Sequence, residues 1–229
     1  MSATPARTFD VRHLQIARAI FAAIAAIMIT FSPDHSAAVG LSVFSGFAIA
    51  TGLVFLLAAW LVYPAGARWP SGTMGALSIV AGMIAGIVGI RSTTLFFSVV
   101  ISWALVMGLV ETVSCVRERS AAFARGDAVA RNAARDGLTV GIITIVVGVA
   151  LLFVPAQYAL QYYIDDANQY FTLTGITIGV GIFGGYAAII AVYLAIAGLS
   201  PRTRPDEASE ASQDRVAAQP ADEAPGGTA

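Results

Sequence analysis

Residues 41–63 read LSVFSGFAIATGLVFLLAAWLVY and contain no charged side chain. A helix needs about 20 mostly apolar residues to cross the hydrocarbon core of a bilayer, so this stretch is long enough to span it. The stretch is apolar on all sides, unlike an amphipathic surface helix, and it lacks the strict alternation of a transmembrane β-strand. It therefore predicts a transmembrane α-helix.

Five more stretches have the same character. The six predicted spans cover residues 14–31, 41–63, 73–90, 94–113, 138–154 and 173–199. The expected fold is all-α: a polytopic membrane protein with six transmembrane helices in a domain of residues 14–199. A cytoplasmic N-terminal segment, 1–13, precedes it. The tail, 200–229, is rich in Pro, Ala, Asp, Glu and Ser, which predicts disorder on the cytoplasmic side.

The composition agrees with a membrane location. Of the 229 residues, 57% are hydrophobic and 12% are charged, and the mean hydropathy is +0.76. Soluble domains carry about 25% charged residues. The net charge of -1 gives no basic field that would recruit nucleic acid. The single cysteine, Cys115, excludes an internal disulfide and a Cys-rich metal site.

Catalytic motifs are missing from the sequence. It has no phosphate-binding glycine loop, nucleophile elbow or metalloprotease helix. We therefore expect a non-enzymatic protein with no cofactor and no metal, whose partner is the lipid bilayer. A small-solute transporter or channel built on Glu111 and the glycine-rich sixth span is the alternative.

The distribution of arginine predicts the orientation in the plasma membrane. Short cytoplasmic loops are enriched in basic residues. The N-terminal region, the loops after spans two and four, and the tail hold twelve of the 13 basic residues, and the opposite side holds only Arg91. Both termini are therefore expected in the cytoplasm. A cleaved signal peptide ending near Ala38 is the competing interpretation of residues 1–38.

The spans are expected to form three repeated two-helix units. The first span ends in Phe31-Ser32-Pro33 and the fifth in Phe153-Val154-Pro155, an offset of 122 residues. Half of that offset leads from Pro33 to Thr94, just after the third span. Spans one, three and five thus hold equivalent positions, and each precedes a span that contains glycine.

These helix ends, the stretch GFAIATGL at residues 46–53 and the three-pair layout resemble the HdeD family of small bacterial membrane proteins. The resemblance covers residues 14–199. It implies a six-helix membrane fold and a link to acid or envelope stress, and it brings no catalytic residues. The chain departs from the shortest members of that family in its loops 114–137 and 155–171 and in its tail.

Small residues four apart let membrane helices approach closely. Such pairs are Gly82 and Gly86, Gly137 and Gly141, Gly175 and Gly179, and Gly181 and Gly185. They predict packing within the bundle, or alternatively a seam between copies in a homo-oligomer.

Ionisable groups inside a span are costly and suggest function. Arg18 in the first span and Glu111 in the fourth differ in predicted depth by about 6 Å, which an arginine side chain can bridge. Three interpretations follow: both groups reach the cytoplasmic headgroups, or they form an ion pair, or Glu111 serves a proton relay or a substrate.

Two loops are distinctive. The outer loop, 155–171, carries Tyr158 and Tyr162 four apart, which would share one face of a short helix, followed by Asp165 and Asp166. It predicts an interfacial tyrosine belt, with a sugar or lipid headgroup site or a weak divalent cation site as alternatives. The inner loop, 114–137, is rich in Arg and Ala and is expected to extend the fourth span and to precede the fifth as short cytoplasmic helices, with basic side chains on anionic lipid; a specific partner site is the alternative.

Overall fold

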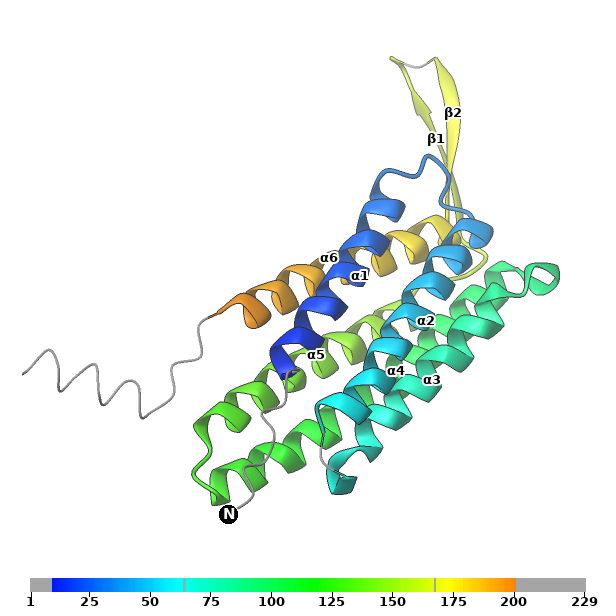
Figure 1. Cartoon of the computed structure of the whole chain (residues 1–229). Coiled ribbons are helices and arrows are strands. Elements are labelled where there is room, and N and C mark those ends of the chain that lie inside the picture. The colour runs from blue at the N-terminus through cyan, green and yellow to red at the C-terminus, as the bar shows by residue number, and fades with distance from the viewer. Residues whose placement is uncertain (1–9, 64, 167, 201–229) are drawn as a thin grey trace, which may run out of the picture. The chain divides into compact units, whose positions relative to one another are not determined.

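The computed structural model describes residues 10–63, 65–166 and 168–200. It contains an antiparallel series of helices and one hairpin (Figure 1). The helices are α1 (Val11–Thr30), α2 (Ala37–Leu61), α3 (Trp69–Gly86), α4 (Thr93–Ala124), α5 (Ala128–Leu152) and α6 (Gly175–Leu199), with 3₁₀ turns η1 (Ala65–Ala67) and η2 (Val88–Ile90) and strands β1 (Ala159–Ile164) and β2 (Gln169–Thr174). The chain divides after Leu199. The predicted tail beyond residue 200 and most of the N-terminal segment lie outside the described residues.

Five helices are long and apolar enough to cross a membrane: α1, α2, α4, α5 and α6. The fold is therefore that of a multi-pass α-helical membrane protein. The remaining predicted span, 73–90, corresponds to α3 and η2. Its helix ends at Gly86, because the backbone of Ile87 is extended (ψ 105°) before the chain turns into η2. The 18-residue α3 is not among the five.

The helices pack in three close pairs, α2 with α3, α4 with α5, and α1 with α6. Contacts of α1 with α2, α3 with α4 and α5 with α6 join the pairs, and in the centre α2 also contacts α4 and α6. Aromatic rings from α2, α4 and α6 meet edge to face in the core, as between Phe44 and Trp103 (5.3 Å between centroids) and between Phe47 and Phe183 (5.7 Å). Such contacts add to the energy of ring burial.

Glycines set the close approach in two of these pairs. A Cβ added at Gly52 of α2 would lie 2.8 Å from the carbonyl oxygen of Gly75 in α3. A Cβ at Gly108 of α4 would lie at the same distance from the carbonyl oxygen of Gly141 in α5. The backbones of the two helices are thus in contact, which is how small residues bring membrane helices together without a hydrophobic driving force.

The inner loop is almost entirely helical. α4 continues without a break to Ala124, and α5 already begins at Ala128. Gly126 makes the turn with φ +69°, a conformation that glycine adopts without strain. The Asp127 side chain then caps α5 by accepting a hydrogen bond from the Ala130 amide at 2.9 Å.

The outer loop contains a β-hairpin, so the prediction of a short helix there is wrong, and the hairpin is the exception to the all-α expectation. β1 and β2 pair antiparallel, with Tyr163 opposite Tyr170. Four residues connect the strands and end in Asn168, whose φ is +48°. Aromatic and β-branched residues on both sides of an Asp- and Asn-rich turn favour this structure.

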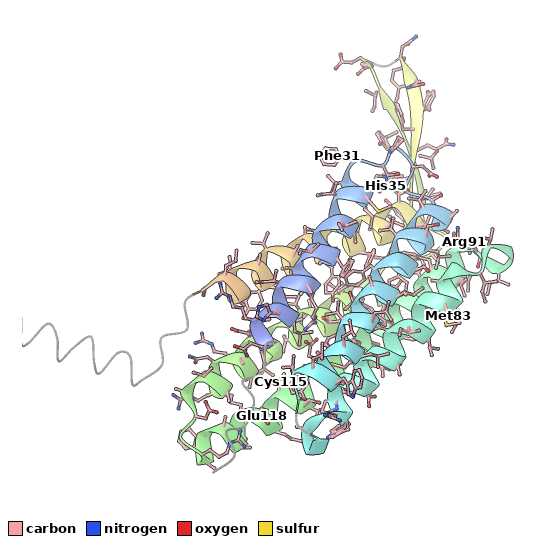
Figure 2. The ribbon with its side chains drawn as sticks, in the orientation of Figure 1. Phe31, His35, Met83, Arg91, Cys115 and Glu118 are labelled. Carbon is pink, nitrogen blue, oxygen red and sulfur yellow. The ribbon has the colours of Figure 1, made fainter. Side chains whose placement is uncertain are left out.

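Figure 1 shows the hairpin projecting from the end of the bundle that also holds the α1–α2 turn. In Figure 2, Phe31, His35 and Arg91 lie toward this end, whereas Cys115 and Glu118 lie toward the opposite one. We call these the hairpin end and the α4–α5 end.

Candidate functional site

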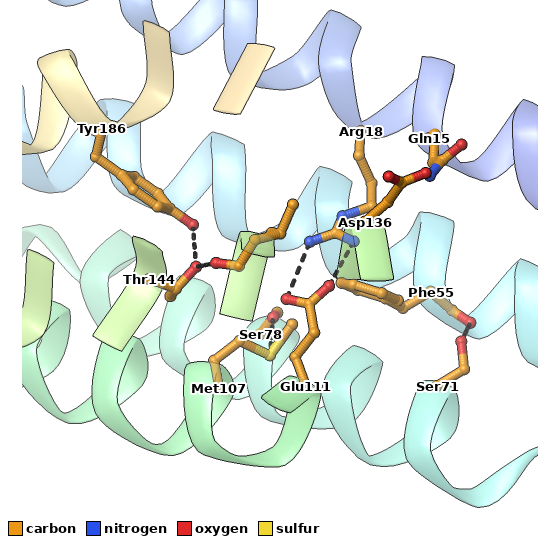
Figure 3. A network of polar contacts seen from close by, with 11 residues as sticks. Gln15, Arg18, Phe55, Ser71, Ser78, Met107, Glu111, Asp136, Thr144 and Tyr186 are labelled. Carbon is orange, nitrogen blue, oxygen red and sulfur yellow. Dashed lines mark hydrogen bonds and ion pairs between the residues drawn. The ribbon is translucent and has the colours of Figure 1, made fainter. Parts of the chain in front are cut away.

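Arg18 of α1 and Glu111 of α4 form an ion pair in the interior of the bundle (Figure 3). The Nη1 atom of Arg18 donates to Oε1 of Glu111 at 2.7 Å, and Nη2 donates to Oε2 at 3.3 Å. The pair is therefore bidentate, the geometry in which a guanidinium and a carboxylate bind each other most strongly.

Both side chains of this pair are buried, unlike side chains that extend to the lipid headgroups. The side chains are only 10% and 4% exposed, respectively. The guanidinium carbon of Arg18 also lies 4.4 Å from the centre of the Phe55 ring on α2. A ring face at this distance attracts the cation, most strongly where water is excluded. The pair thus connects α1, α2 and α4.

The positions of Arg18 in α1 and Glu111 in α4 explain why the two side chains meet. Arg18 lies two turns from the start of α1, on the face that also buries Leu14 and Ala22. Glu111 lies on the buried face of α4 with Met107 and Gly108. Glu111 is also one turn from Gly108, the residue at which α5 crosses α4. Its backbone therefore belongs to a tightly packed segment of α4.

A small cavity of about 10 Å³ lies beside the ion pair. This is at the lower limit for holding one water molecule. Side chains from five helices line the cavity: Arg18, Phe47, Thr51, Trp103, Met107, Glu111, Thr144, Tyr186 and Ile190.

One polar atom of this cavity has no hydrogen-bond partner within the described part of the chain. It is the Oγ1 of Thr51, a residue that is 3% exposed. Leaving a buried hydroxyl unpaired costs about 1–3 kcal/mol, and a water in the cavity would remove that cost.

Several other polar groups near the cavity are hydrogen-bonded within the bundle. Thr144 and Tyr186 share a hydrogen bond of 3.1 Å between their hydroxyls, and Thr144 also donates to the Val140 carbonyl. The indole nitrogen of Trp103 donates to Ser78 at 3.1 Å. These bonds fix ring orientations at the centre of the bundle.

A second polar cluster lies toward the α4–α5 end. Asp136 of α5 accepts hydrogen bonds from Gln15 of α1 at 3.3 Å and from Tyr193 of α6 at 3.5 Å. Gln15 is one turn from Arg18. Asp136 therefore ties α5 to the α1–α6 pair.

The sequence alone indicates Arg18 and Glu111 but not the groups around them. Thr51, Thr144, Tyr186 and Asp136 are single polar residues in or beside apolar spans. Their signal is weak, because hydroxyl side chains are common in membrane helices and often bond to their own backbone.

The predicted packing glycines separate into two sets. A Cβ at Gly82, Gly86, Gly137, Gly141, Gly175 or Gly179 would meet a neighbouring atom within 3.1 Å. A Cβ at Gly181 or Gly185 of α6 would meet nothing within 4 Å. The first set packs inside the chain, and the second faces outward.

The outer-loop candidates are spread along the hairpin. Tyr158 precedes β1, Tyr162 stacks on Phe171 at 6.1 Å between centroids, and Asp165 and Asp166 lie in the turn. The described residues contain no group of three His, Cys, Asp or Glu side chains that could hold a metal ion.

No protein-family model, curated protein or solved structure matches the chain.

Proposed function

We propose that this protein is a non-enzymatic, HdeD-like structural component of the plasma membrane that serves in envelope or acid stress. The buried bidentate ion pair between Arg18 and Glu111 carries the proposal. A pair that neutralises both charges in the bundle interior locks helices together and leaves neither charge free for a solute.

The size of the adjoining cavity supports a static role. About 10 Å³ holds at most one water and is far too small for a hydrated ion or a metabolite. The backbone contacts at Gly52 and Gly108 also resist separation of the helices.

We further propose six spans, with α3 as the short one, in three related units. In both glycine-mediated pairs an isoleucine covers the glycine: Ile79 lies 2.7 Å from a Cβ at Gly52, and Ile145 lies 2.7 Å from a Cβ at Gly108. In the α1–α6 pair, Ile29 lies 2.7 Å from a Cβ at Gly184. In all three pairs an isoleucine of one helix thus contacts a glycine of the other, which supports the repeat. The spacing does not follow the prediction, because Ile29, Ile79 and Ile145 are 50 and 66 residues apart and the predicted spacing is 61.

The proposed orientation places the α4–α5 end and both termini in the cytoplasm. The basic residues of the α2–α3 and α4–α5 connections are at that end, and Arg91 is at the hairpin end. Such an asymmetry determines the orientation of multi-pass proteins.

The experiment is proton flux in reconstituted vesicles, combined with acid survival of a deletion strain. Vesicles that hold the wild-type chain and a pH-sensitive dye should leak protons no faster than empty vesicles. The deletion strain should survive acid less well than the complemented strain. Proton flux that disappears in Glu111→Gln would overturn the static role, and unchanged survival would overturn the stress role.

A transporter or channel centred on Glu111 is the second candidate, and the unpartnered hydroxyl of Thr51 favours it. A polar atom that faces a cavity beside an ion pair can bind a water that carries a proton. The glycine-rich part of α6 gives this candidate less support than expected, because Gly181 and Gly185 face outward.

The outward glycines instead support a homo-oligomer. Gly181 and Gly185 lie one turn apart on a face of α6 that also exposes Ile189 and Val192. Small residues at this spacing let a second helix approach closely. We propose that two copies associate along this face.

A further inference from the structure

A groove of about 650 Å³ lies where the end of α4 meets the start of α5. Its lining residues are Val116, Arg119, Ser120, Phe123, Arg131 and Leu138. None of the residues already assigned to the ion pair or its cavity belongs to it.

Two guanidinium groups in this groove form no ion pair with the residues that the structure describes. The ion pairs found in the described ranges are Arg18 with Glu111 and Arg125 with Glu118, and neither includes Arg119 or Arg131. The two arginines come from different helices and line the same groove. An anion between them would receive charge-assisted hydrogen bonds from both sides.

The rest of the lining is mainly apolar and exposed. Phe123 is 72% exposed and Val116 is 48% exposed. Val116 and Leu138 lie on the side of the two arginines that faces the apolar segments of α4 and α5, where an acyl chain would cover them, and Phe123 lies on the other side. The groove thus combines an anion-binding pair with a hydrocarbon-binding wall.

The position of the groove matches the boundary of the bilayer. α4 has 32 residues and is therefore about 48 Å long, against about 30 Å for the hydrocarbon core. Leu138 is where the apolar part of α5 begins, and Arg131 lies two turns before it. The arginines therefore lie at headgroup depth when the apolar segments fill the core.

We propose that this groove binds an anionic phospholipid, with its phosphate held by Arg119 and Arg131 and an acyl chain against Val116 and Leu138. The requirement for both parts distinguishes the lipid from free phosphate. This inference needs only that the bundle lies in a bilayer, and it does not depend on the proposed stress function.

The test measures lipid affinity from the shift in thermal unfolding of the full chain in neutral detergent, because a ligand that binds the folded state raises its stability. The probes are dioleoyl phosphatidylglycerol, dioleoyl phosphatidylcholine and inorganic phosphate. The variant is Arg119→Gln with Arg131→Gln. The matched control is Arg117→Gln with Arg135→Gln, which removes the same charge from the same two helices outside the groove lining.

For the wild type we expect phosphatidylglycerol to bind at least about tenfold more tightly than phosphatidylcholine, and inorganic phosphate to give no comparable shift. The groove variant should lose about tenfold in phosphatidylglycerol affinity, while the control should change less than about twofold. An equal loss in both variants would show a general electrostatic attraction and overturn the site. A shift from inorganic phosphate as large as that from the lipid would overturn the choice of a lipid. All four arginines are exposed, so both variants should fold, and their unfolding temperatures without lipid verify this.

Discussion

Arg18 and Glu111, 93 residues apart in the chain, join both terminal nitrogens of one side chain to both oxygens of the other. Each is the counter-ion of the other in a part of the bundle that water scarcely reaches. Breaking the pair on one side leaves an uncompensated buried charge.

The first prediction concerns the strength of this pair. Glu111→Gln should lower the free energy of unfolding by about 2 kcal/mol, between the 3–5 kcal/mol of broken buried pairs and the roughly 0.6 kcal/mol of hydrogen bonds between membrane helices. The measurement is unfolding in detergent of Arg18→Gln, Glu111→Gln and the double variant. The double variant should lose less than the sum of the single losses, and strict additivity would contradict the coupling.

The second prediction concerns the contact of α4 with α5. Gly108→Ala places a Cβ 2.8 Å from the Gly141 carbonyl oxygen, which belongs to the backbone and cannot rotate away. We expect a loss of about 1–3 kcal/mol in stability from this overpacking. Gly46→Ala is the control, because its Cβ meets nothing within 4 Å. It should leave stability unchanged or raise it by up to about 1 kcal/mol, as alanine does in a helix. Equal stability of the two variants would contradict the close approach.

The third prediction concerns association of two copies. Gly185→Leu should reduce the cross-linked dimer in membranes about tenfold, because a leucine blocks close approach along α6. The monomer should keep its stability, since a Cβ at Gly185 meets no neighbouring atom within 4 Å. Gly46→Leu adds the same side chain to another open position, on α2, and should leave the dimer intact. If the dimer survives Gly185→Leu, this face is not the seam.

The fourth prediction is topological. In a Cys115→Ser background, single cysteines at Asp34 and Asp165 should react with a membrane-impermeant maleimide on intact cells. Cysteines at Arg125 and at Asp206, which lies outside the described residues, should react only after the cells are opened. Labelling of position 125 from outside would reverse the proposed orientation. Loss of an N-terminal tag through cleavage near Ala38 would establish the signal-peptide interpretation.

The helical part of the fold is predictable because the thickness of a bilayer fixes the length of an apolar run. Residues 41–63 illustrate this: the helix α2 that they predict covers Ala37–Leu61. Counting residues from the helix ends predicts similar depths in the membrane for Arg18 and Glu111. Depth alone does not determine which faces meet, so it does not predict Thr51, Thr144 or Tyr186 around the pair.

The hairpin was missed because a spacing of four residues fits two periods. Tyr158 and Tyr162 share a face in a helix, and alternation places residues four apart on one face of a strand as well. The stronger signal was the turn composition that ends in Asn168. The helix pairs were missed for a different reason: all six runs are apolar, so composition leaves their partners undetermined.

The pairing of α1 with α6 has a consequence for biogenesis. α1 is the first helix synthesised and α6 the last, so α1 cannot complete its packing until the whole domain has left the ribosome. After Arg18 has been synthesised, 93 more residues must be translated before Glu111 is present, which takes roughly 5–20 seconds at the usual rates of synthesis. During that interval the insertion machinery or lipid headgroups must accommodate a guanidinium without its counter-ion. The first helix to be synthesised is therefore among the last to complete its packing.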